Sequence, residues 1–110
     1  MKVAIDTADS AEAAHRIAAW WAELLGARVV DDDRGFSYVD RVPGAPFDSL
    51  DFAPVPEPKT VKNRIHLDVT TADVDDLVAA GATILRAKDD EIDWTVMADP
   101  DGNEFCAFTV

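Results

Sequence analysis

An internal repeat constrains this chain more than any other feature. When Ala8–Asp9 is aligned with Ala72–Asp73, the apolar runs before them superpose, and Lys2 falls on His66. After each aligned pair comes a helical pattern that ends in Gly-Ala, and then three short extended segments separated by turn residues. The sequence therefore predicts strand, helix and three strands, twice over.

The hydrophobic spacing predicts the individual elements. Apolar residues at i, i+3, i+4, i+7 and i+8 form one face of a first helix, which ends at Gly26. Asp9 and Glu12 resemble a capping box at its start. That face consists of Ile17, Trp20, Trp21, Leu24 and Leu25. A shorter helix is predicted between Asp73 and Gly81. Strands are predicted over 2–7, 27–30, 36–42, 49–53, 64–69, 82–87, 93–98 and 104–110.

These elements define an α+β fold class. A single βαβββ unit leaves an apolar sheet face that it cannot bury alone. We therefore expect two βαβββ modules to form a curved eight-stranded mixed sheet, with the helices on the outer face and the inner trough free for a ligand. Module one is assigned to 1–53, a proline-bearing linker to 54–63 and module two to 64–110, within one domain of residues 1–110.

Charge and composition exclude several classes of partner. The net charge of −12 is expected to repel nucleic acid and anionic membranes. No apolar run approaches the roughly 20 residues of a membrane span, and the N-terminus lacks a signal-peptide pattern. The single cysteine, Cys106, has no partner for an internal disulfide, which favours the cytoplasm. A small molecule is the expected partner.

Three stretches resemble the vicinal oxygen chelate superfamily, which includes glyoxalase I, extradiol dioxygenases and the bleomycin- and fosfomycin-resistance proteins. The stretches are AAWWAELLGARVV, KTVKNRIHLDV and DWTVMADPDGNEFCAF. The pair KNRIHLDV and DPDGNEFC is similar to the glyoxalase-like domain branch. The resemblance covers nearly the whole chain and also implies a homodimer.

Enzymes of that superfamily typically hold a divalent metal through four side chains on the inner sheet face. The resemblance places these positions at Lys2, Asp51, His66 and Cys106. A protonated lysine cannot ligate a cation, and Cys106 replaces the usual glutamate, although Glu104 lies on the same strand face. We therefore expect no complete metal site and favour no cofactor. If a divalent metal binds, His66 and Asp51 are its expected ligands, and otherwise Lys2 and Asp51 are suited to an ion pair.

The central histidine lies on a predicted strand. Alternation places His66, Asp68 and Thr70 toward the trough and Ile65, Leu67 and Val69 toward the helices. His66 is predicted to contact a ligand or transfer a proton. The alternative is a histidine that only hydrogen-bonds Asp68 or a neighbouring strand.

The other candidates follow from the same face. The predicted ligand-binding residues are Lys2, Asp51, His66, Trp94, Glu104 and Cys106, and the catalytic candidates are His66 and Glu104. Trp94 can flank a planar ligand or serve only in packing. His15 and the run Asp31–Asp33 are interpreted as solvated surface, and Trp20 and Trp21 as core.

Three functions remain open at this point. The first is a metal-free protein that binds a small cationic or aromatic molecule in the trough, as resistance proteins of this fold do. The second is a metal-dependent lyase, isomerase or dioxygenase of the glyoxalase-like group. The third is an accessory domain whose trough is vestigial.

Overall fold

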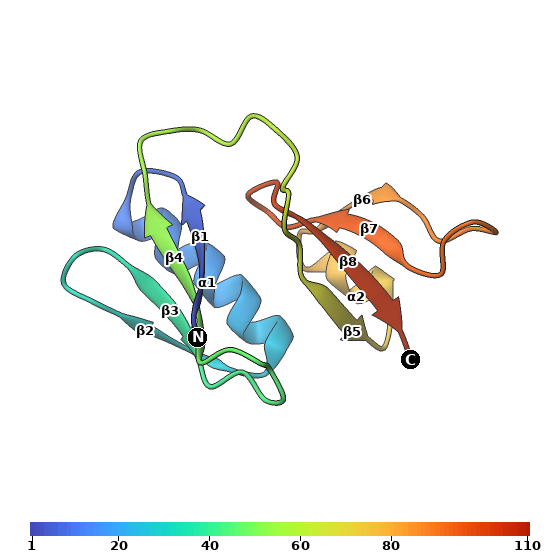
Figure 1. Ribbon diagram of the computed structural model, residues 1–110, viewed down its shortest axis with the longest axis horizontal. Helices are drawn as coiled ribbons and strands as arrows, with labels where there is room; N and C mark the ends of the chain where they lie inside the picture. The colour runs from blue at the N-terminus through green and yellow to red at the C-terminus, as the bar shows by residue number, and fades with distance from the viewer. The chain divides into compact units, whose positions relative to one another are not determined.

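The computed structural model describes residues 1–110 and confirms the predicted order of elements (Figure 1). The elements are β1 (Val3–Thr7), α1 (Ala11–Leu25), β2 (Arg28–Asp31), β3 (Ser37–Asp40), β4 (Ser49–Pro54), β5 (Asp68–Thr71), α2 (Val74–Ala79), β6 (Thr83–Arg86), β7 (Thr95–Ala98) and β8 (Glu104–Thr109). The fold is therefore α+β, with two βαβββ modules and eight strands.

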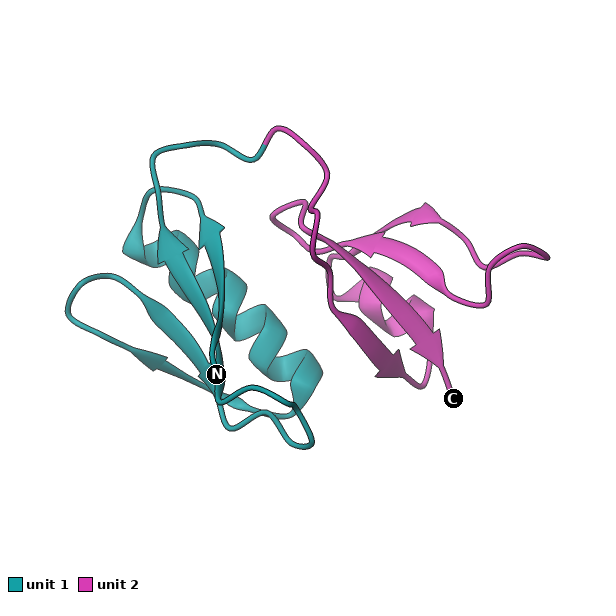
Figure 2. Cartoon of the chain, viewed as in Figure 1, with its two compact units in different colours: residues 1–59 teal, residues 60–110 magenta.

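The eight strands are hydrogen-bonded as two four-stranded sheets. Their orders are β1-β4-β3-β2 and β5-β8-β7-β6, so the two modules share one topology. In each sheet the first and last strands of the module pair in parallel, and the other pairs are antiparallel. The chain divides into two compact units, Met1–Lys59 and Thr60–Val110 (Figure 2).

Helix α1 starts one residue later than the sequence indicated. Its N-cap is Ser10, whose hydroxyl accepts a hydrogen bond from the Ala13 amide at 3.0 Å. The expected capping box at Asp9 is therefore wrong, because serine in extended backbone satisfies the free amide there. The helix ends at Gly26, whose φ of 67° is the left-handed conformation that glycine adopts without strain.

The core of the first unit lies between α1 and its sheet. The helix packs against β2, β3 and β4 through a buried stripe of Ala13, Ala14, Ile17, Ala18, Trp21 and Ala22. Opposite this stripe, Val39, Leu50 and Phe52 are completely buried. Trp20, Leu24 and Leu25 are only half-buried, because small alanines, not the predicted larger residues, complete the stripe. Trp21 is a core residue, as predicted.

The second unit has a smaller helix and a smaller core. Helix α2 starts at the N-cap Asp73 and buries one residue, Leu77. The buried side chains of its sheet include Val69, Met97 and Phe105. Ile65 was predicted to face the helices but is 83% exposed, because β5 begins only at Asp68. No helix of the chain is both long and apolar enough to cross a membrane.

Candidate functional site

Two parallel strands bring the central residues of the second unit together. Strand β5 pairs with β8 so that Asp68 lies opposite Cys106, and the Cys106 amide donates to the Leu67 carbonyl at 2.9 Å. Residues directly opposite one another in a sheet share a face. On this sheet Phe105 and Ala107 alternate with Cys106 and are also buried. The thiol and the Asp68 carboxylate therefore lie on one face of the sheet.

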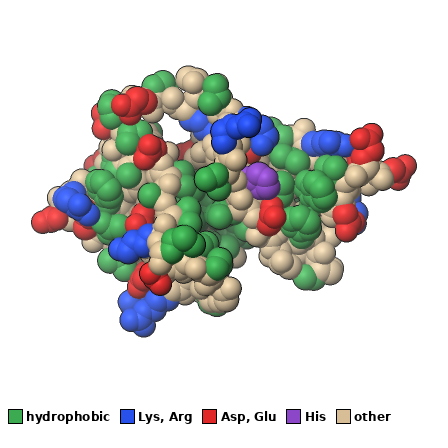
Figure 3. Space-filling view, in the orientation of Figure 1, with side chains coloured by type: hydrophobic (Ala, Val, Ile, Leu, Met, Phe, Trp, Pro, Cys, Tyr) green, Lys and Arg blue, Asp and Glu red, His purple; other side chains and the backbone are tan.

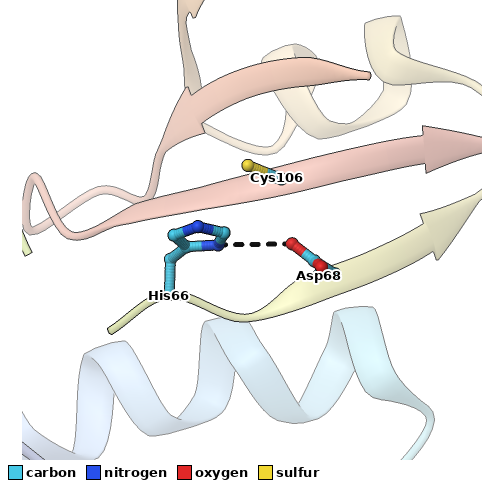
Figure 4. Close-up of side chains that lie close together, drawn as sticks. All are labelled: His66, Asp68 and Cys106. Atoms are coloured by element: carbon cyan, nitrogen blue, oxygen red, sulfur yellow. Dashed lines mark ion pairs between the residues drawn. The ribbon is translucent and has the colours of Figure 1, made fainter. Parts of the chain in front are cut away.

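His66 joins this pair from the segment just before β5. Its Nδ1 lies 3.2 Å from Oδ1 of Asp68, and the side chains are 40% and 58% exposed (Figure 4). The ligand atoms of His66, Asp68 and Cys106 all lie within 4.8 Å of one another. A contact between His66 and Asp68 is what we expected if His66 served only to hydrogen-bond a neighbour. Both side chains nevertheless remain accessible to solvent.

Cys106 differs from its two neighbours because it is buried, with 6% of the residue's surface exposed. Burial raises the pKa of Cys106, and the negative charge of Asp68 raises it further, against a smaller opposing effect of Lys62. The neutral thiol is therefore favoured. Without a bound cation, Cys106 is a poor nucleophile.

An aromatic pair lies on the same face. Trp94 precedes β7, and its ring centroid is 5.8 Å from that of Phe108, with the planes inclined by 36°. Phe108 and Cys106 are two residues apart on β8, so their side chains point the same way about 7 Å apart. The site thus combines a polar end at His66 and Asp68 with an apolar end at Trp94 and Phe108.

Glu104 anchors the segment that carries His66. Its Oε1 accepts a hydrogen bond from the Asn63 amide at 3.0 Å, across a sequence separation of 41 residues. This contact ties the approach to β5 onto the first residue of β8. The carboxylate of this candidate thus has a direct role in positioning the chain.

Lys2 and Asp51 belong to the first unit. Lys2 Nζ lies 5.7 Å from the centroid of the Tyr38 ring, and Asp51 accepts a hydrogen bond from the Ser49 hydroxyl. The ion pair suggested between Lys2 and Asp51 is not formed, and each group has another partner. Asp51 is buried, so its hydrogen bond from Ser49 offsets part of its desolvation.

The donor set in the second unit fits a borderline metal such as Zn²⁺. Imidazole nitrogen, carboxylate oxygen and thiolate sulfur are all zinc ligands, and three protein ligands leave a fourth position open. Ligand atoms around tetrahedral zinc are about 3.5 Å apart. The atoms of His66 and Asp68, at 3.2 Å, already lie this close, so the adjustment needed is between Cys106 and these two side chains. Metal binding would also have to displace the thiol proton of Cys106.

Sequence alternation placed Asp68 on the same face as His66, which it contacts, but did not count it as a ligand. The resemblance directed attention to the four positions usual in the superfamily, and Asp68 is not among them. The signal that could have identified it is the spacing His-x-Asp, which in an extended segment puts both side chains on one side of the chain.

The aspartates at 31–33 have more structure than the predicted solvated turn. Asp32 accepts hydrogen bonds from the backbone amides of Arg34 and Phe36 and from the Tyr38 hydroxyl. The Tyr38 hydroxyl is the main cause that holds the pKa of Asp32 well below its usual range. His15 is exposed as predicted, but its ring also pairs with Asp31.

Charge on the molecule is mixed in sign locally despite the strong acidic total. Acidic and basic side chains are interspersed on the face shown in Figure 3. In the second unit, Arg86 pairs with Asp89 and Glu91, and Lys88 pairs with Asp93. Exposed pairs of this kind contribute little to stability.

The duplicated βαβββ topology and the sheet-borne site define a class of protein, and comparison with known proteins identifies it. The family model for the glyoxalase-like domain matches residues 2–108. The chain therefore belongs to the glyoxalase-like domain family. No curated protein matches the chain significantly.

Solved structures share the fold at low sequence identity. A glyoxalase/bleomycin resistance protein/dioxygenase family enzyme from Burkholderia phytofirmans PsJN is 23% identical, with a TM-score of 0.68 over 99% of this chain and 96% of its own. The Leishmania major glyoxalase I is 17% identical, with a TM-score of 0.59 over 98% and 84%. TioX from Micromonospora sp. ML1 is 20% identical, with a TM-score of 0.58 over 100% and 94%.

Proposed function

We propose that the second module binds a small organic molecule on the sheet face that carries His66, Asp68, Cys106, Trp94 and Phe108. The observation that carries this proposal is the placement of a polar group and an aromatic pair on one face. A planar ligand suits the aromatic end, since rings gain from offset or edge contacts. A cationic or hydrogen-donating group suits the exposed carboxylate of Asp68.

The names of similar structures agree with this class of function, since three of them mention bleomycin resistance. The chain's net charge of −12 also favours a cationic ligand over an anionic one.

The test uses proflavine, a planar aromatic cation, in NMR titrations of the ¹⁵N-labelled protein. We expect shifts at amides of β5, β7 and β8. We also expect Asp68→Asn to weaken binding about tenfold, the effect of losing one charged contact. Asp90→Asn removes the same charge from an exposed turn of the same unit and is the matched control.

Equal losses in Asp68→Asn and Asp90→Asn would mean general charge attraction and would reject a specific site. Shifts confined to residues 1–59 would also reject it. Trp94→Ala gives an independent check. Loss of the aromatic end should raise the Kd for proflavine, while the contact between His66 and Asp68 stays in place.

A second candidate is a metal-dependent enzyme of the glyoxalase-like group, namely a lyase, isomerase or dioxygenase. It is favoured by the three ligand atoms within 4.8 Å. A metal held by His66, Asp68 and Cys106 would polarise substrate oxygen atoms. The protein's own residues would position it, with Glu104 fixing the segment that bears His66.

Elemental analysis and cobalt titration separate the two candidates. A metal site predicts stoichiometric zinc in the purified protein and a thiolate-to-cobalt absorption band that is lost in Cys106→Ser and in His66→Ala. Asp90→Asn should leave both signals unchanged. Absence of the metal and of the band would reject this candidate without affecting the proflavine test.

A further inference from the structure

A second candidate site lies in the first unit, at the start of α1. A pocket of about 330 Å³ is lined by Ala11, Glu12 and His15 of the helix and by Asp31, Phe36 and Ser37 of the β2–β3 hairpin. Gly35, at φ 87°, also lines it and lies against Ala11, where an added Cβ would come to 3.4 Å of the alanine Cβ. A volume above about 300 Å³ is enough for a small ligand.

A hydrogen-bond chain fixes the polar wall of this pocket. Ser37, itself 1% exposed, donates its hydroxyl to Oδ1 of Asp31 at 2.7 Å, and His15 Nδ1 lies 2.9 Å from Oδ2 of the same carboxylate. His15 is the largest cause that lowers the pKa of Asp31, followed by Ser37. An ionised carboxylate can only accept, so Nδ1 carries the ring proton.

This arrangement fixes the tautomer of His15. When Nδ1 of a neutral imidazole holds the proton, Nε2 is an acceptor. Nε2 makes no hydrogen bond within the protein. The ring is therefore oriented by Asp31 and has one acceptor left for a ligand.

The remaining lining selects the charge of that ligand. Glu12 is exposed and lies one helical turn before His15, so both side chains occupy one side of α1. The carboxylate of Asp32, which also lines the pocket, is compensated by Arg34 at 2.9 Å. No cationic side chain pairs with the Glu12 carboxylate in this way. An anion is therefore disfavoured, and a group that carries both positive charge and N–H donors is favoured.

The apolar part of the lining selects the body of the ligand. Ala11 and Phe36 provide hydrocarbon surface beside the polar wall. We propose that this pocket binds a small primary amine, whose ammonium group contacts His15 Nε2 and Glu12 and whose short apolar group lies against Ala11 and Phe36. The site lies wholly within the first unit and shares no residue with the face proposed above.

The experiment is an NMR titration of the ¹⁵N-labelled full chain with benzylamine, and with benzyl alcohol as the uncharged analogue. We expect benzylamine to shift amides of residues 11–15 and 31–37 and benzyl alcohol to shift them far less. Glu12→Gln should raise the Kd of benzylamine about tenfold. Glu23→Gln, an exposed glutamate further along the same helix, should leave the Kd unchanged.

Three results would overturn the proposal. These are no saturable shift with benzylamine at millimolar concentration, equal responses to the amine and the alcohol, and equal effects of Glu12→Gln and Glu23→Gln. Binding mapped only to residues 60–110 would count against this pocket while supporting the other site. His15→Gln provides a second variant, since it retains a polar side chain but loses the ring acceptor. It should also raise the Kd of benzylamine.

Discussion

The two modules place different chemistry on equivalent positions of one topology. The alignment that pairs Lys2 with His66 also pairs Ala4 with Asp68, and strand register pairs Ala4 with Asp51 as it pairs Asp68 with Cys106. Module one therefore carries lysine, alanine and aspartate where module two carries histidine, aspartate and cysteine. The first set has its polar groups engaged with Tyr38 and Ser49, whereas the second gathers three ligand atoms.

The modules also differ in how they are stabilised. Helix α1 has 15 residues and buries six of them, whereas α2 has six residues and buries one. The two modules thus share one strand topology although the amount of helix packed on each sheet differs. A sheet framework of this kind can exchange the residues on one face without changing its register, because the backbone hydrogen bonds do not depend on side chains.

The largest expected effect concerns the cores. Leu50 and Phe105 occupy equivalent positions and are almost completely buried. We expect Phe105→Ala to cost about 3–5 kcal/mol and Leu50→Ala about 2–5 kcal/mol in free energy of unfolding. The loss should be greater in module two, where the helix buries little else. Urea denaturation and amide hydrogen exchange measure the free energy of unfolding of both variants. A larger loss of this free energy for Leu50→Ala would contradict the proposed difference in core size.

The helix ends test whether the modules are equivalent in detail. Ala27 donates to the Ala22 carbonyl at 2.9 Å, and Ala82 donates to the Leu77 carbonyl at 3.0 Å, so both helices close with the same bond after a positive-φ glycine. Gly26→Ala and Gly81→Ala should each cost about 1–2 kcal/mol. Ala80→Gly serves as the control because Ala80 is right-handed. A neutral Gly81→Ala would break the equivalence.

The reactivity of the single thiol, Cys106, tests how the face of module two differs from the equivalent face of module one. Because burial and Asp68 raise the pKa of Cys106, we expect alkylation by iodoacetamide at pH 8 to be slower than that of glutathione. Asp68→Asn should accelerate it severalfold, and Asp90→Asn should not. Mass spectrometry follows the rate. Alkylation as fast as that of glutathione would contradict both the raised pKa and the burial of this thiol.

Low pH should destabilise the β2–β3 hairpin of module one. Hydrogen bonds from His15 and Ser37 lower the pKa of Asp31, and the Tyr38 hydroxyl is the chief cause of the lowered pKa of Asp32. Their stabilisation is complete above the unfolded pKa of about 3.9 and is lost as the pH falls through the lower folded values. The effect should be small because Asp31 is half-exposed. Amide exchange in β2 and β3 at pH 5 and pH 3 measures it, and Asp31→Asn should reduce the difference.

Much of the fold could be predicted from sequence because its signals are local. The alternation in KVAIDT, the helical stripe around Ile17 and Trp21, and the DPDGN turn each correspond to an observed element. The turn is real: the Asp99 carboxylate accepts from the amides of Asp101 and Asn103. The N-cap at Ser10 and the late start of β5 were missed, because cap geometry and strand ends depend on backbone contacts that periodicity does not encode.

The candidate sites were less predictable than the fold. His66 and Cys106 were selected through the resemblance, but their grouping with Asp68 depends on the parallel register of β5 and β8, which joins residues far apart in sequence. The pocket beside His15 was not predicted. It requires the β2–β3 hairpin to meet the start of α1, and helical spacing alone marked His15 only as surface.

The hydrogen bond from Asn63 to Glu104 has a practical consequence for protein engineering. A library that varies the face around His66 to obtain new specificity would normally include every carboxylate near it. Glu104 should be kept constant in such a library, because its oxygen holds the polypeptide immediately ahead of the histidine. Diversity is better directed to Thr70, Trp94 and Val96, whose side chains can change while that attachment persists.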